Sequence, residues 1–432
     1  MLIDFEFANF CSFRDTARLS LEPIPAFKER PENTFSASKL SLLKGAALYG
    51  PNAGGKSNFI KAVGFATNFV AQSAIARSPG SAIPVTPFRL DTATESAPSR
   101  FQFTLLEGEL RYRYGFSVDH KEVQAEWLYV TDFSKQRARQ KALFLREGSS
   151  IDVRSGIPDA PALISRTRAD ALFLSVAAQW NDPLASQLVA LLSNVRVLYG
   201  LHDDLYQHYS ANMAQGEDRR RAERMLTACR SVDPGLANIR IEEQELDPSL
   251  VERVLSQFSS DAQASEIRRV LKKLVLLEHP KYSEGRVVGT VAFDLEEDAS
   301  AGTQKYFRIL GPIIDTLERG LTLFVDELEA KLHPLMTRSI VQMFQSSDSN
   351  PKNAQLVFCT HDTNLLTYAG LRRDQIWFVE KSKEGSSTLY PLSDFNGVRQ
   401  ESDLESDYIS GRFGAIPFPG GPAALADLHK GC

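Results

Sequence analysis

Residues 50–57 combine glycines with a lysine and a hydroxyl side chain at a fixed spacing. They read Gly50-Pro51-Asn52-Ala53-Gly54-Gly55-Lys56-Ser57 and match the pattern G-x-x-x-x-G-K-[ST]. Glycines let backbone N–H groups turn inward as a cradle for phosphate oxygens, and the positive end of a following helix adds to the attraction. In such a loop Lys56 reaches the β- and γ-phosphates, and the Ser57 hydroxyl ligates Mg²⁺. The segment predicts a nucleoside triphosphate site that extends to Asn58.

The neighbouring sequence favours this interpretation over a glycine-rich turn with an incidental lysine. Residues 42–49 are mostly apolar and predict a short buried strand that leads into the loop. Residues 57–63 have apolar side chains at 59, 60 and 63, which is typical of a helix start. A strand, a loop and a helix in this order form the context that a P-loop requires.

A second apolar strand, predicted at 321–326, ends in two acids, Asp326 and Glu327. Next to a P-loop, Asp326 would hold Mg²⁺ directly or through water. Glu327 would be placed to orient or deprotonate an attacking water. A strand followed by an acidic surface turn is the alternative, which the upstream P-loop makes the weaker one.

A third apolar strand, predicted at 355–359, is followed by Thr360 and His361. A histidine at a strand end can reach a γ-phosphate and its attacking water, and so act as a sensor. A satisfied structural histidine is the alternative. We expect the sensor role because His361 follows the other motifs in order.

Residues 298–305 precede a helix predicted at 306–317. Ser300 would cap this helix and leave Gly302 and Thr303 near its positively polarised N-terminus, which suits a phosphate. An ordinary capped helix explains the local sequence equally well.

Composition limits the class of protein. The chain has 432 residues, of which 43% are hydrophobic and 24% charged, and a formal net charge of −5, so there is no global basic signal for nucleic acid. No apolar run approaches the length of a membrane span, and the N-terminus does not resemble a secretory signal. The four cysteines are scattered, which predicts a reduced, cytoplasmic location.

The pattern along the chain predicts three parts. Residues 1–130 form an N-terminal lobe with a β-hairpin and the P-loop, including a second hairpin at 101–118. Residues 131–285 form a mainly helical insertion, with helices expected at 171–180 and 217–230 and helical apolar spacing at 250–277. Residues 286–432 form a C-terminal lobe with the remaining motifs.

The order of these motifs resembles ABC-type ATPase heads of the SMC and RecF kind. Residues 300–304 look like their signature loop, 326–334 like their Walker B and D-loop, Thr360-His361 like their switch histidine, and 9–15 like their first β-hairpin. The chain is more similar to a prokaryotic family of AAA/ABC-type ATP-binding proteins, which includes RloA-type and abortive-infection ATPases and the ATPase half of the PARIS anti-phage system. The ATPase part of overcoming-lysogenization-defect nucleases is related. The features that carry this similarity are Glu-Leu-Glu-x-x-Leu-His-Pro at 327–334, Gly302-Thr303, and the segments 375–381 and 411–417.

The resemblance implies an α/β fold of the ABC-type P-loop NTPase head, with an N-terminal antiparallel β subdomain and the insertion. It implies an ATPase that uses ATP and Mg²⁺, with Glu327, Lys56 and His361 as catalytic residues. Two protomers would sandwich two ATPs, with Ser300, Gly302 and Thr303 of one facing the P-loop of the other; a higher oligomer stays open. The signature reads Ser-Ala-Gly-Thr-Gln rather than Ser-Gly-Gly-Gln, and no Q-loop glutamine is evident.

Three functions are compatible with these motifs. The first is the sensor or regulator ATPase of an anti-phage defence system, a dimeric switch that controls a separate effector such as a nuclease or toxin. The acidic run at 401–407 is expected to be a solvated loop rather than a metal site. The second is a RecF-like DNA-repair ATPase that binds DNA, for which the basic cluster at 219–224 is a candidate, although a solvated helix face explains it better. The third, a transporter ATPase subunit at a membrane, is the weakest.

Overall fold

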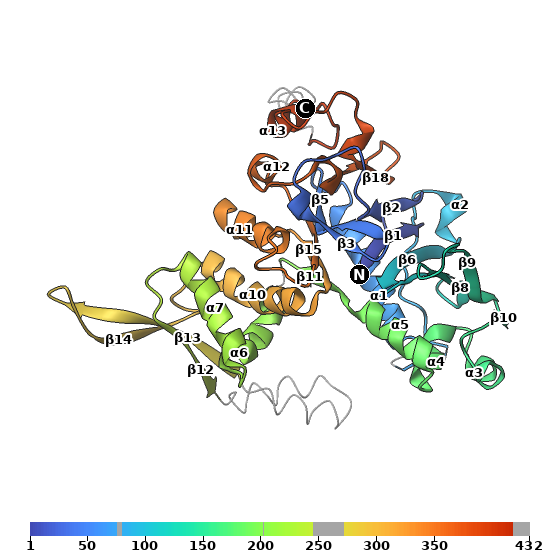
Figure 1. Cartoon of the computed structure of the whole chain (residues 1–432), viewed down its shortest axis with the longest axis horizontal. Helices are drawn as coiled ribbons and strands as arrows, with labels where there is room; N and C mark the ends of the chain where they lie inside the picture. The colour runs from blue at the N-terminus through green and yellow to red at the C-terminus, as the bar shows by residue number, and fades with distance from the viewer. Residues whose placement is uncertain (76–79, 202, 245–271, 418–432) are drawn as a thin grey trace, which may run out of the picture. The chain divides into compact units, whose positions relative to one another are not determined.

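The computed structural model describes residues 1–75, 80–201, 203–244 and 272–417, which divide into two compact units (Figure 1). The described parts of Met1–Gly200, Arg319–Glu329 and Arg338–Cys432 form the first unit. Those of Leu201–Glu318 and Ala330–Thr337 form the second. No helix among the described residues is both long enough and apolar enough to cross a membrane.

The first unit contains a seven-stranded antiparallel sheet. In spatial order its strands are β10 (Ser150–Val153), β9 (Gln140–Glu147), β8 (Val123–Asp132), β7 (Leu110–Val118), β6 (Ser99–Glu107), β1 (Leu2–Ala8) and β2 (Ala17–Ser20). Phe5 and Phe7 of β1 are fully buried and lie opposite Phe103 and Phe101 of β6. Such facing aromatic pairs on one side of a sheet fix its register. The N-terminal antiparallel part and the hairpin at 101–118 are as the sequence predicts.

A six-stranded sheet in the same unit contains the strands that precede the motifs. Its order is β11 (Val195–Tyr199), β15 (Thr322–Asp326), β16 (Gln355–Cys359), β5 (Gly45–Tyr49), β17 (Ile376–Lys381) and β18 (Ser387–Pro391). All neighbours are parallel except β17 and β18. All residues of β5 and β16 are buried, as expected for central parallel strands covered on both faces. The antiparallel sheet and the mostly parallel sheet of this unit confirm the predicted α/β class.

The predicted strand at 42–49 is two strands. β4 (Leu40–Leu43) pairs with β3 (Thr34–Ala37), and β5 begins only at Gly45. The chain changes sheets at Lys44, whose buried ammonium donates to the carbonyl oxygen of Gln345 at 2.8 Å. A side chain at Gly45 would overlap the Leu356 backbone of β16, so the crossing into the parallel sheet needs glycine.

Helices complete the first unit. They are α1 (Lys56–Gln72), α2 (Thr92–Glu95), α3 (Ala160–Arg166), α4 (Phe173–Gln179), α5 (Pro183–Ser193), α12 (Asn364–Tyr368) and α13 (Leu404–Ile409), with short 3₁₀ turns η1 (Pro31–Asn33), η3 (Arg373–Gln375) and η4 (Leu392–Asp394). α11 (Pro334–Gln345) begins in the second unit and ends in the first. α1 packs against β11, β15 and α5, and so buries the apolar stripe that the sequence predicts. The helix predicted at 171–180 is α4.

A buried carboxylate joins α4 to the antiparallel sheet. Glu126 of β8 accepts the N–H groups of Phe173 and Leu174, at 2.7 and 3.0 Å, in the first turn of α4. It also accepts the hydroxyl of Tyr114 at 2.9 Å and lies 3.8 Å from the guanidinium of Arg146. Burial raises the pKa of Glu126, while the nearby charge of Arg146 opposes that shift. The carboxylate therefore caps a helix that has no capping side chain of its own.

The second unit combines helices with a small sheet. Its elements are η2 (Asp203–Tyr206), α6 (Gln207–Gln215), α7 (Arg219–Val232), β12 (Asn238–Gln244), β13 (Lys272–Ser283), β14 (Arg286–Asp294) and α10 (Ala301–Arg319). Buried Asp203 accepts the ammonium of Lys331 at 3.0 Å and the guanidinium of Arg308 at 3.2 Å. The β13–β14 hairpin, yellow in Figure 1, extends beyond α6 and α7. The helix predicted at 217–230 is α7.

One predicted helical segment is only partly testable. Of residues 250–277, those at 250–271 lie outside the described residues. Helix is wrong for the remainder, because Lys272 to Leu277 open β13 and pair with β12 on one side. The apolar run from Leu274 to Leu277 is compatible with a buried helix and with a buried strand. Pairing with β12 determines that it forms a strand. The division into parts at 1–130, 131–285 and 286–432 stays a prediction.

We expect Glu126→Ala to lower the free energy of unfolding by about 3–5 kcal/mol, because it leaves Arg146 buried without its partner and removes the cap of α4. Urea unfolding followed by circular dichroism measures the change. Glu147→Ala, at the exposed end of β9, is the matched control and should shift the midpoint little. Equal midpoints for the two variants would show that the buried carboxylate does not stabilise the fold.

Candidate nucleotide-binding site

The predicted P-loop lies between β5 and α1, at the carboxyl end of a central parallel strand. Gly55, at φ 121°, occupies the position before α1 and gives the helix no side-chain cap. Ala53 has a left-handed backbone, at φ 61°. Since the first-turn N–H groups of a helix have no partner within the helix, an uncapped start leaves them for an anion.

Two serines from distant parts of the chain form hydrogen bonds that hold this loop and the start of α1. The Ser387 Oγ of β18 lies 2.6 Å from the Gly54 carbonyl oxygen and 2.8 Å from the Oγ of Ser12. Ser12 also accepts from the Nδ2 of Asn58 at 2.8 Å. A side chain at Gly55 would collide with Ser387. Neither serine is among the site residues that the sequence predicts, and the only sequence signal for Ser12 is a small hydroxyl inside the predicted first hairpin.

Lys56 is buried, and its ammonium folds back onto the loop. The Nζ atom lies 2.8 Å from the Gly50 carbonyl oxygen, 3.2 Å from that of Pro51 and 2.9 Å from the Nε2 of His361. Burial lowers the pKa of Lys56, and the nearby acids, among them Asp326 and Glu327, oppose this shift. The ammonium is thus held by neutral acceptors that a stronger, anionic acceptor can replace.

Asp326 ends β15 beside Ser57. Burial raises the pKa of Asp326, and a hydrogen bond from the Ser57 side chain and the charge of Lys56 oppose the rise. Asp326 Oδ1 is buried and has no hydrogen-bond partner. A carboxylate oxygen without a partner next to a hydroxyl matches the oxygen ligands that Mg²⁺ prefers, so these two residues fit the predicted metal.

The acids after Asp326 lie at the same sheet edge. Glu327 adopts a left-handed backbone, at φ 49°, which ends the strand abruptly. The next amide, of Leu328, donates to the Cys359 carbonyl oxygen at 3.2 Å, so the turn is tied to β16. Glu329 Oε1 accepts the His361 N–H at 2.6 Å. From the sequence, Glu329 is only one residue of the segment that resembles a Walker B and D-loop. Its link to the histidine depends on the parallel pairing of β15 with β16.

His361 faces the lysine of the P-loop. Burial lowers its pKa below the ordinary value, and the charge of Lys56 lowers it further. The neutral ring accepts from the Lys56 ammonium through Nε2, which leaves the proton on Nδ1. The structure therefore brings Lys56, Ser57, Asp326, Glu327 and His361 together at the carboxyl ends of β5, β15 and β16.

The predicted signature residues belong to the second unit. Ser300 caps α10, since its Oγ accepts the Thr303 N–H at 3.1 Å and lies 2.9 Å from the Thr303 hydroxyl. A side chain at Gly302 would come within 2.8 Å of the Lys331 carbonyl oxygen. The capping role is confirmed. Contact of Ser300, Gly302 and Thr303 with a nucleotide stays a prediction.

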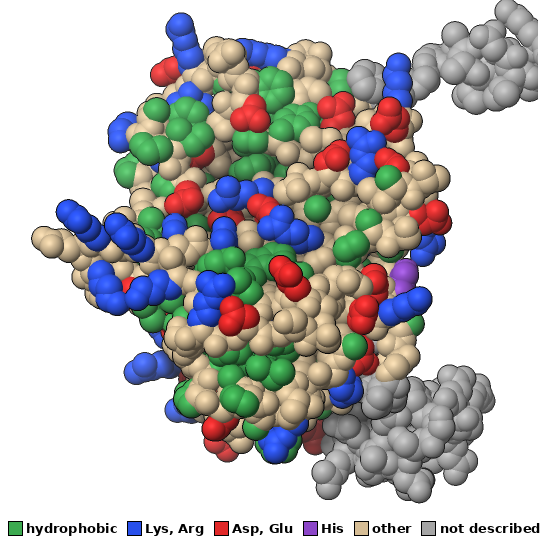
Figure 2. Space-filling view, turned by 90° about the vertical axis from the view of Figure 1, so that its right-hand side faces the viewer, with side chains coloured by type: hydrophobic (Ala, Val, Ile, Leu, Met, Phe, Trp, Pro, Cys, Tyr) green, Lys and Arg blue, Asp and Glu red, His purple; other side chains and the backbone are tan. Residues whose placement is uncertain are grey.

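Two of the four arginines in the basic cluster at 219–224 are paired within the second unit. Arg221 and Arg224 of α7 lie 2.7 and 2.9 Å from the carboxylate of Glu318 on α10. These pairs fit the solvated helix face better than a phosphate-binding patch. On the face shown in Figure 2, basic and acidic side chains are mixed over much of the surface, and several Lys and Arg side chains gather on the part that projects at the left of the view.

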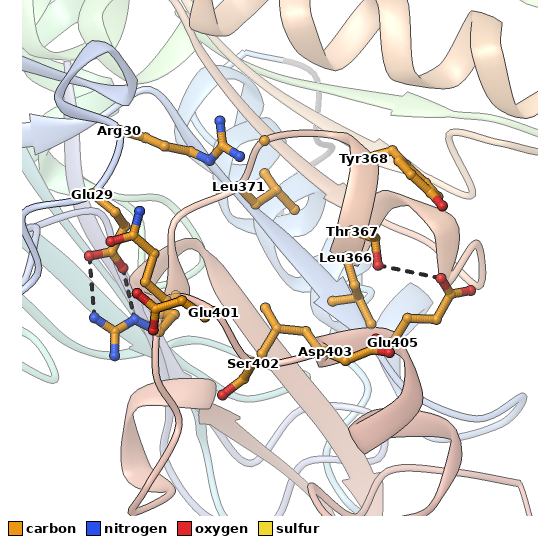
Figure 3. Close-up of a pocket in the computed structure, with 14 residues that line it drawn as sticks. Glu29, Arg30, Leu366, Thr367, Tyr368, Leu371, Glu401, Ser402, Asp403 and Glu405 are labelled. Carbon is orange, nitrogen blue, oxygen red and sulfur yellow. Dashed lines mark hydrogen bonds and ion pairs between the residues drawn. The ribbon is translucent and has the colours of Figure 1, made fainter.

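The acidic run at 401–407 contributes to a pocket of about 470 Å³ in the first unit (Figure 3). Two of its acids that line the pocket already have partners: Glu405 accepts the hydroxyls of Thr363 and Thr367 at 2.7 and 3.4 Å, and Asp403 caps α13. Opposite them, Arg373 is paired with Glu29 at 2.8 Å. None of the residues predicted to bind nucleotide lines this pocket. In the part of the chain that the structure describes, no group of three or more His, Cys, Asp or Glu side chains is arranged around a metal position.

Comparison with known proteins places this geometry in context. No curated protein matches the chain. Among solved structures the chain is similar to "SMC head domain from Thermotoga maritima", with 13% sequence identity over 90% of this chain and 98% of that chain and a TM-score of 0.37. Residues 46–367, more than half of the chain, match the family described as "AAA domain, putative AbiEii toxin, Type IV TA system". That match runs from β5 through the P-loop to His361 and beyond, and the protein belongs to this family of AAA-type ATP-binding domains.

Proposed function

We propose that this protein is a Mg²⁺-dependent ABC-type ATPase that acts as a dimeric switch, and that it is the sensor or regulator of an anti-phage defence system. One observation carries the ATPase part. Lys56, Ser57, Asp326, Glu327 and His361, which are up to 305 positions apart in the sequence, lie together where β5, β15 and β16 end. This is the set of groups that hydrolysis of a nucleoside triphosphate requires.

Each of these residues has a distinct task in the proposed reaction. The P-loop amides and the Lys56 ammonium bind phosphate oxygens, so Lys56 exchanges the carbonyls of Gly50 and Pro51 for anionic acceptors. Ser57 and Asp326 hold Mg²⁺, which when bound neutralises charge on the phosphates. Glu327 takes the proton of the attacking water. His361 senses the γ-phosphate because its ring already contacts Lys56.

The proposed switch depends on the Lys56 ammonium, whose charge is incompletely paired before ATP binds. A buried ammonium held by carbonyl oxygens is only partly compensated, so an added triphosphate gains strong interactions at this position. In the proposed dimer, Ser300, Gly302 and Thr303 at the start of α10 close on the nucleotide of the other protomer. The positively polarised N-terminal end of this 19-residue helix suits that task. ATP then holds the protomers together, and hydrolysis releases them.

The defence role is supported by the family rather than by the site. The family description names a putative AbiEii toxin and a type IV toxin–antitoxin system. The resemblance to abortive-infection and PARIS-type ATPases points to the same setting, a cytoplasmic one, with a separate nuclease or toxin as effector. For a RecF-like DNA-repair ATPase the main candidate contact was the cluster at 219–224, and pairing of Arg221 and Arg224 with Glu318 weakens it.

We expect Lys56→Met to weaken ATP binding by more than about 100-fold, because several charge-assisted contacts to phosphate are lost together while the apolar stem is kept. Fluorescence titration with a labelled ATP analogue measures this. Lys61→Met, on the exposed side of the same helix, is the control and should bind normally. Normal binding by the Lys56 variant would rule out the P-loop assignment.

We expect Glu327→Gln to lower the rate of ATP hydrolysis by about 100-fold or more while ATP still binds, because the amide cannot accept the proton of water. The same variant should accumulate as an ATP-bound dimer in analytical ultracentrifugation. Glu384→Gln, an exposed acid between β17 and β18, is the control. Hydrolysis at the normal rate by the Glu327 variant would refute its role as the base.

The defence role is tested by capture of partners. Glu327→Gln protein with ATP is recovered from its native host with and without phage, and bound protein and nucleic acid are identified. We expect a nuclease or small toxin to co-purify with the ATP-bound form and to be absent from the Lys56→Met control. Recovery of DNA without a protein partner would favour the repair ATPase instead.

A further inference from the structure

The segment 327–329 reads Glu-Leu-Glu, and the reaction proposed above gives a task only to the first of its two acids. The second acid, Glu329, is bonded to the backbone of the switch histidine, since its Oε1 accepts the N–H of His361 at 2.6 Å. A hydrogen bond from an amide to a carboxylate is charge-assisted and stronger than one between neutral groups. This bond therefore holds the residue that is proposed to sense the γ-phosphate.

The strand that lies beside β16 ends before it reaches His361. The last aligned pair of β15 and β16 is Val325 with Phe358. Glu327 then turns the chain with a left-handed backbone, at φ 49°. A backbone N–H group beyond the end of the neighbouring strand needs another acceptor.

The side chain of Glu329 supplies that acceptor. The Leu328 amide still donates to the Cys359 carbonyl oxygen at 3.2 Å. Backbone groups two residues apart on a strand face the same neighbour, so the His361 N–H faces the side on which Leu328 lies. The carboxylate of Glu329 thus continues the hydrogen bonding along this side of β16 where the backbone of β15 has turned away.

The opposite side of the same turn is also fixed. The N–H of Thr360 donates to the Leu48 carbonyl oxygen of β5 at 3.1 Å. The backbone at His361 is therefore held between β5 on one side and Glu329 on the other. From this position the imidazole Nε2 of His361 lies 2.9 Å from the Nζ of Lys56.

Glu329 is not placed to act as a second base. Its Oε1 is engaged by the His361 amide, and its Oε2 is buried and has no hydrogen-bond partner. A general base must reach the water whose proton it takes, and a carboxylate oxygen closed to solvent does not. Glu329 can therefore influence the reaction through His361.

We propose that Glu329 is a positioning residue for hydrolysis, which fixes the backbone of His361 and so directs its ring to Lys56 and the γ-phosphate. The inference rests on the sensor role proposed above for His361. It gives Glu329 no contact with the nucleotide, so the rate of hydrolysis should depend on this carboxylate much more than the affinity for ATP does.

Substitution at Glu329 tests the role of the acceptor. We expect Glu329→Ala to lower kcat by about tenfold and to change the Kd for ATP by less than about twofold, because the P-loop stays intact. Glu329→Gln should keep kcat within about twofold, since its amide oxygen can accept the same N–H. Asp348→Ala, at an exposed acid between α11 and β16, is the matched control and should hydrolyse ATP normally. Equal losses of kcat in the Ala and Gln variants would overturn the proposal.

A double variant tests whether Glu329 acts through the histidine. Glu329→Ala combined with His361→Ala should hydrolyse ATP as fast as His361→Ala alone, because nothing is left for Glu329 to position. The thermal midpoint of each variant, measured without nucleotide, accounts for any loss of folded protein. A further loss of about threefold or more in the double variant would show an independent role and contradict the proposal.

A measurement without ATP separates this inference from the proposed function. Isotope-labelled histidine gives a backbone amide signal in NMR for each of the seven histidines, and the signal missing from His361→Ala identifies His361. We expect Glu329→Ala to raise the exchange rate of this amide with solvent by at least about tenfold, and Glu329→Gln to leave it slow. A parent protein that hydrolyses no ATP would refute the ATPase function and leave this contact measurable. Unchanged exchange in Glu329→Ala would overturn the contact itself.

Discussion

The parallel pairing of β15, β16 and β5 is the constraint on which the candidate site depends. Val325 aligns with Phe358, and Phe358 with Ala47, so the three strands end within one or two residues of each other. The P-loop follows β5, the acids follow β15 and His361 follows β16, so the sheet places all three motifs at one edge. Since a parallel sheet is buried on both faces, its strands must be apolar, and the polar groups are confined to their ends. Chemistry at the carboxyl edge is a consequence of this topology.

Gln355 shows how the parallel sheet is fixed to the N-terminal part of the same unit. This buried amide, at the start of β16, accepts the Leu2 N–H and donates to the carbonyl oxygens of Leu2 and Leu43. Thr322 of β15 donates to the same amide. A fully satisfied buried polar group specifies one arrangement, because any other leaves its donors and acceptors unpaired. It fixes the amino ends of the parallel strands, while the Ser12–Ser387 contact supports the P-loop at their carboxyl ends.

The electrostatics of the site favour the binding of an anion. Lys56 is buried among carbonyls, His361 is kept neutral by burial and by that ammonium, and Asp326 retains an oxygen with no partner. Each of these arrangements costs free energy that a bound Mg²⁺ nucleotide would recover. Left-handed backbone at Ala53 and Glu327 falls in the same loops, as strain often does at functional sites.

The sequence by itself determined the motifs, because phosphate binding demands particular residue types at fixed local spacing. It also determined the strands and helices in which apolar residues repeat regularly over many positions, such as α1 and the β6–β7 hairpin. Only the tertiary structure decided what depends on distant pairing. Residues 272–277 fit a helix locally and became a strand because β12 lies beside them. Ser12, Ser387 and Glu329 acquire their contacts with the site from segments that are far apart in the chain. The exposure of the apolar side chains of β14 likewise cannot be read from its sequence, because local pattern says which side chains avoid water but not whether the fold provides a neighbour to cover them.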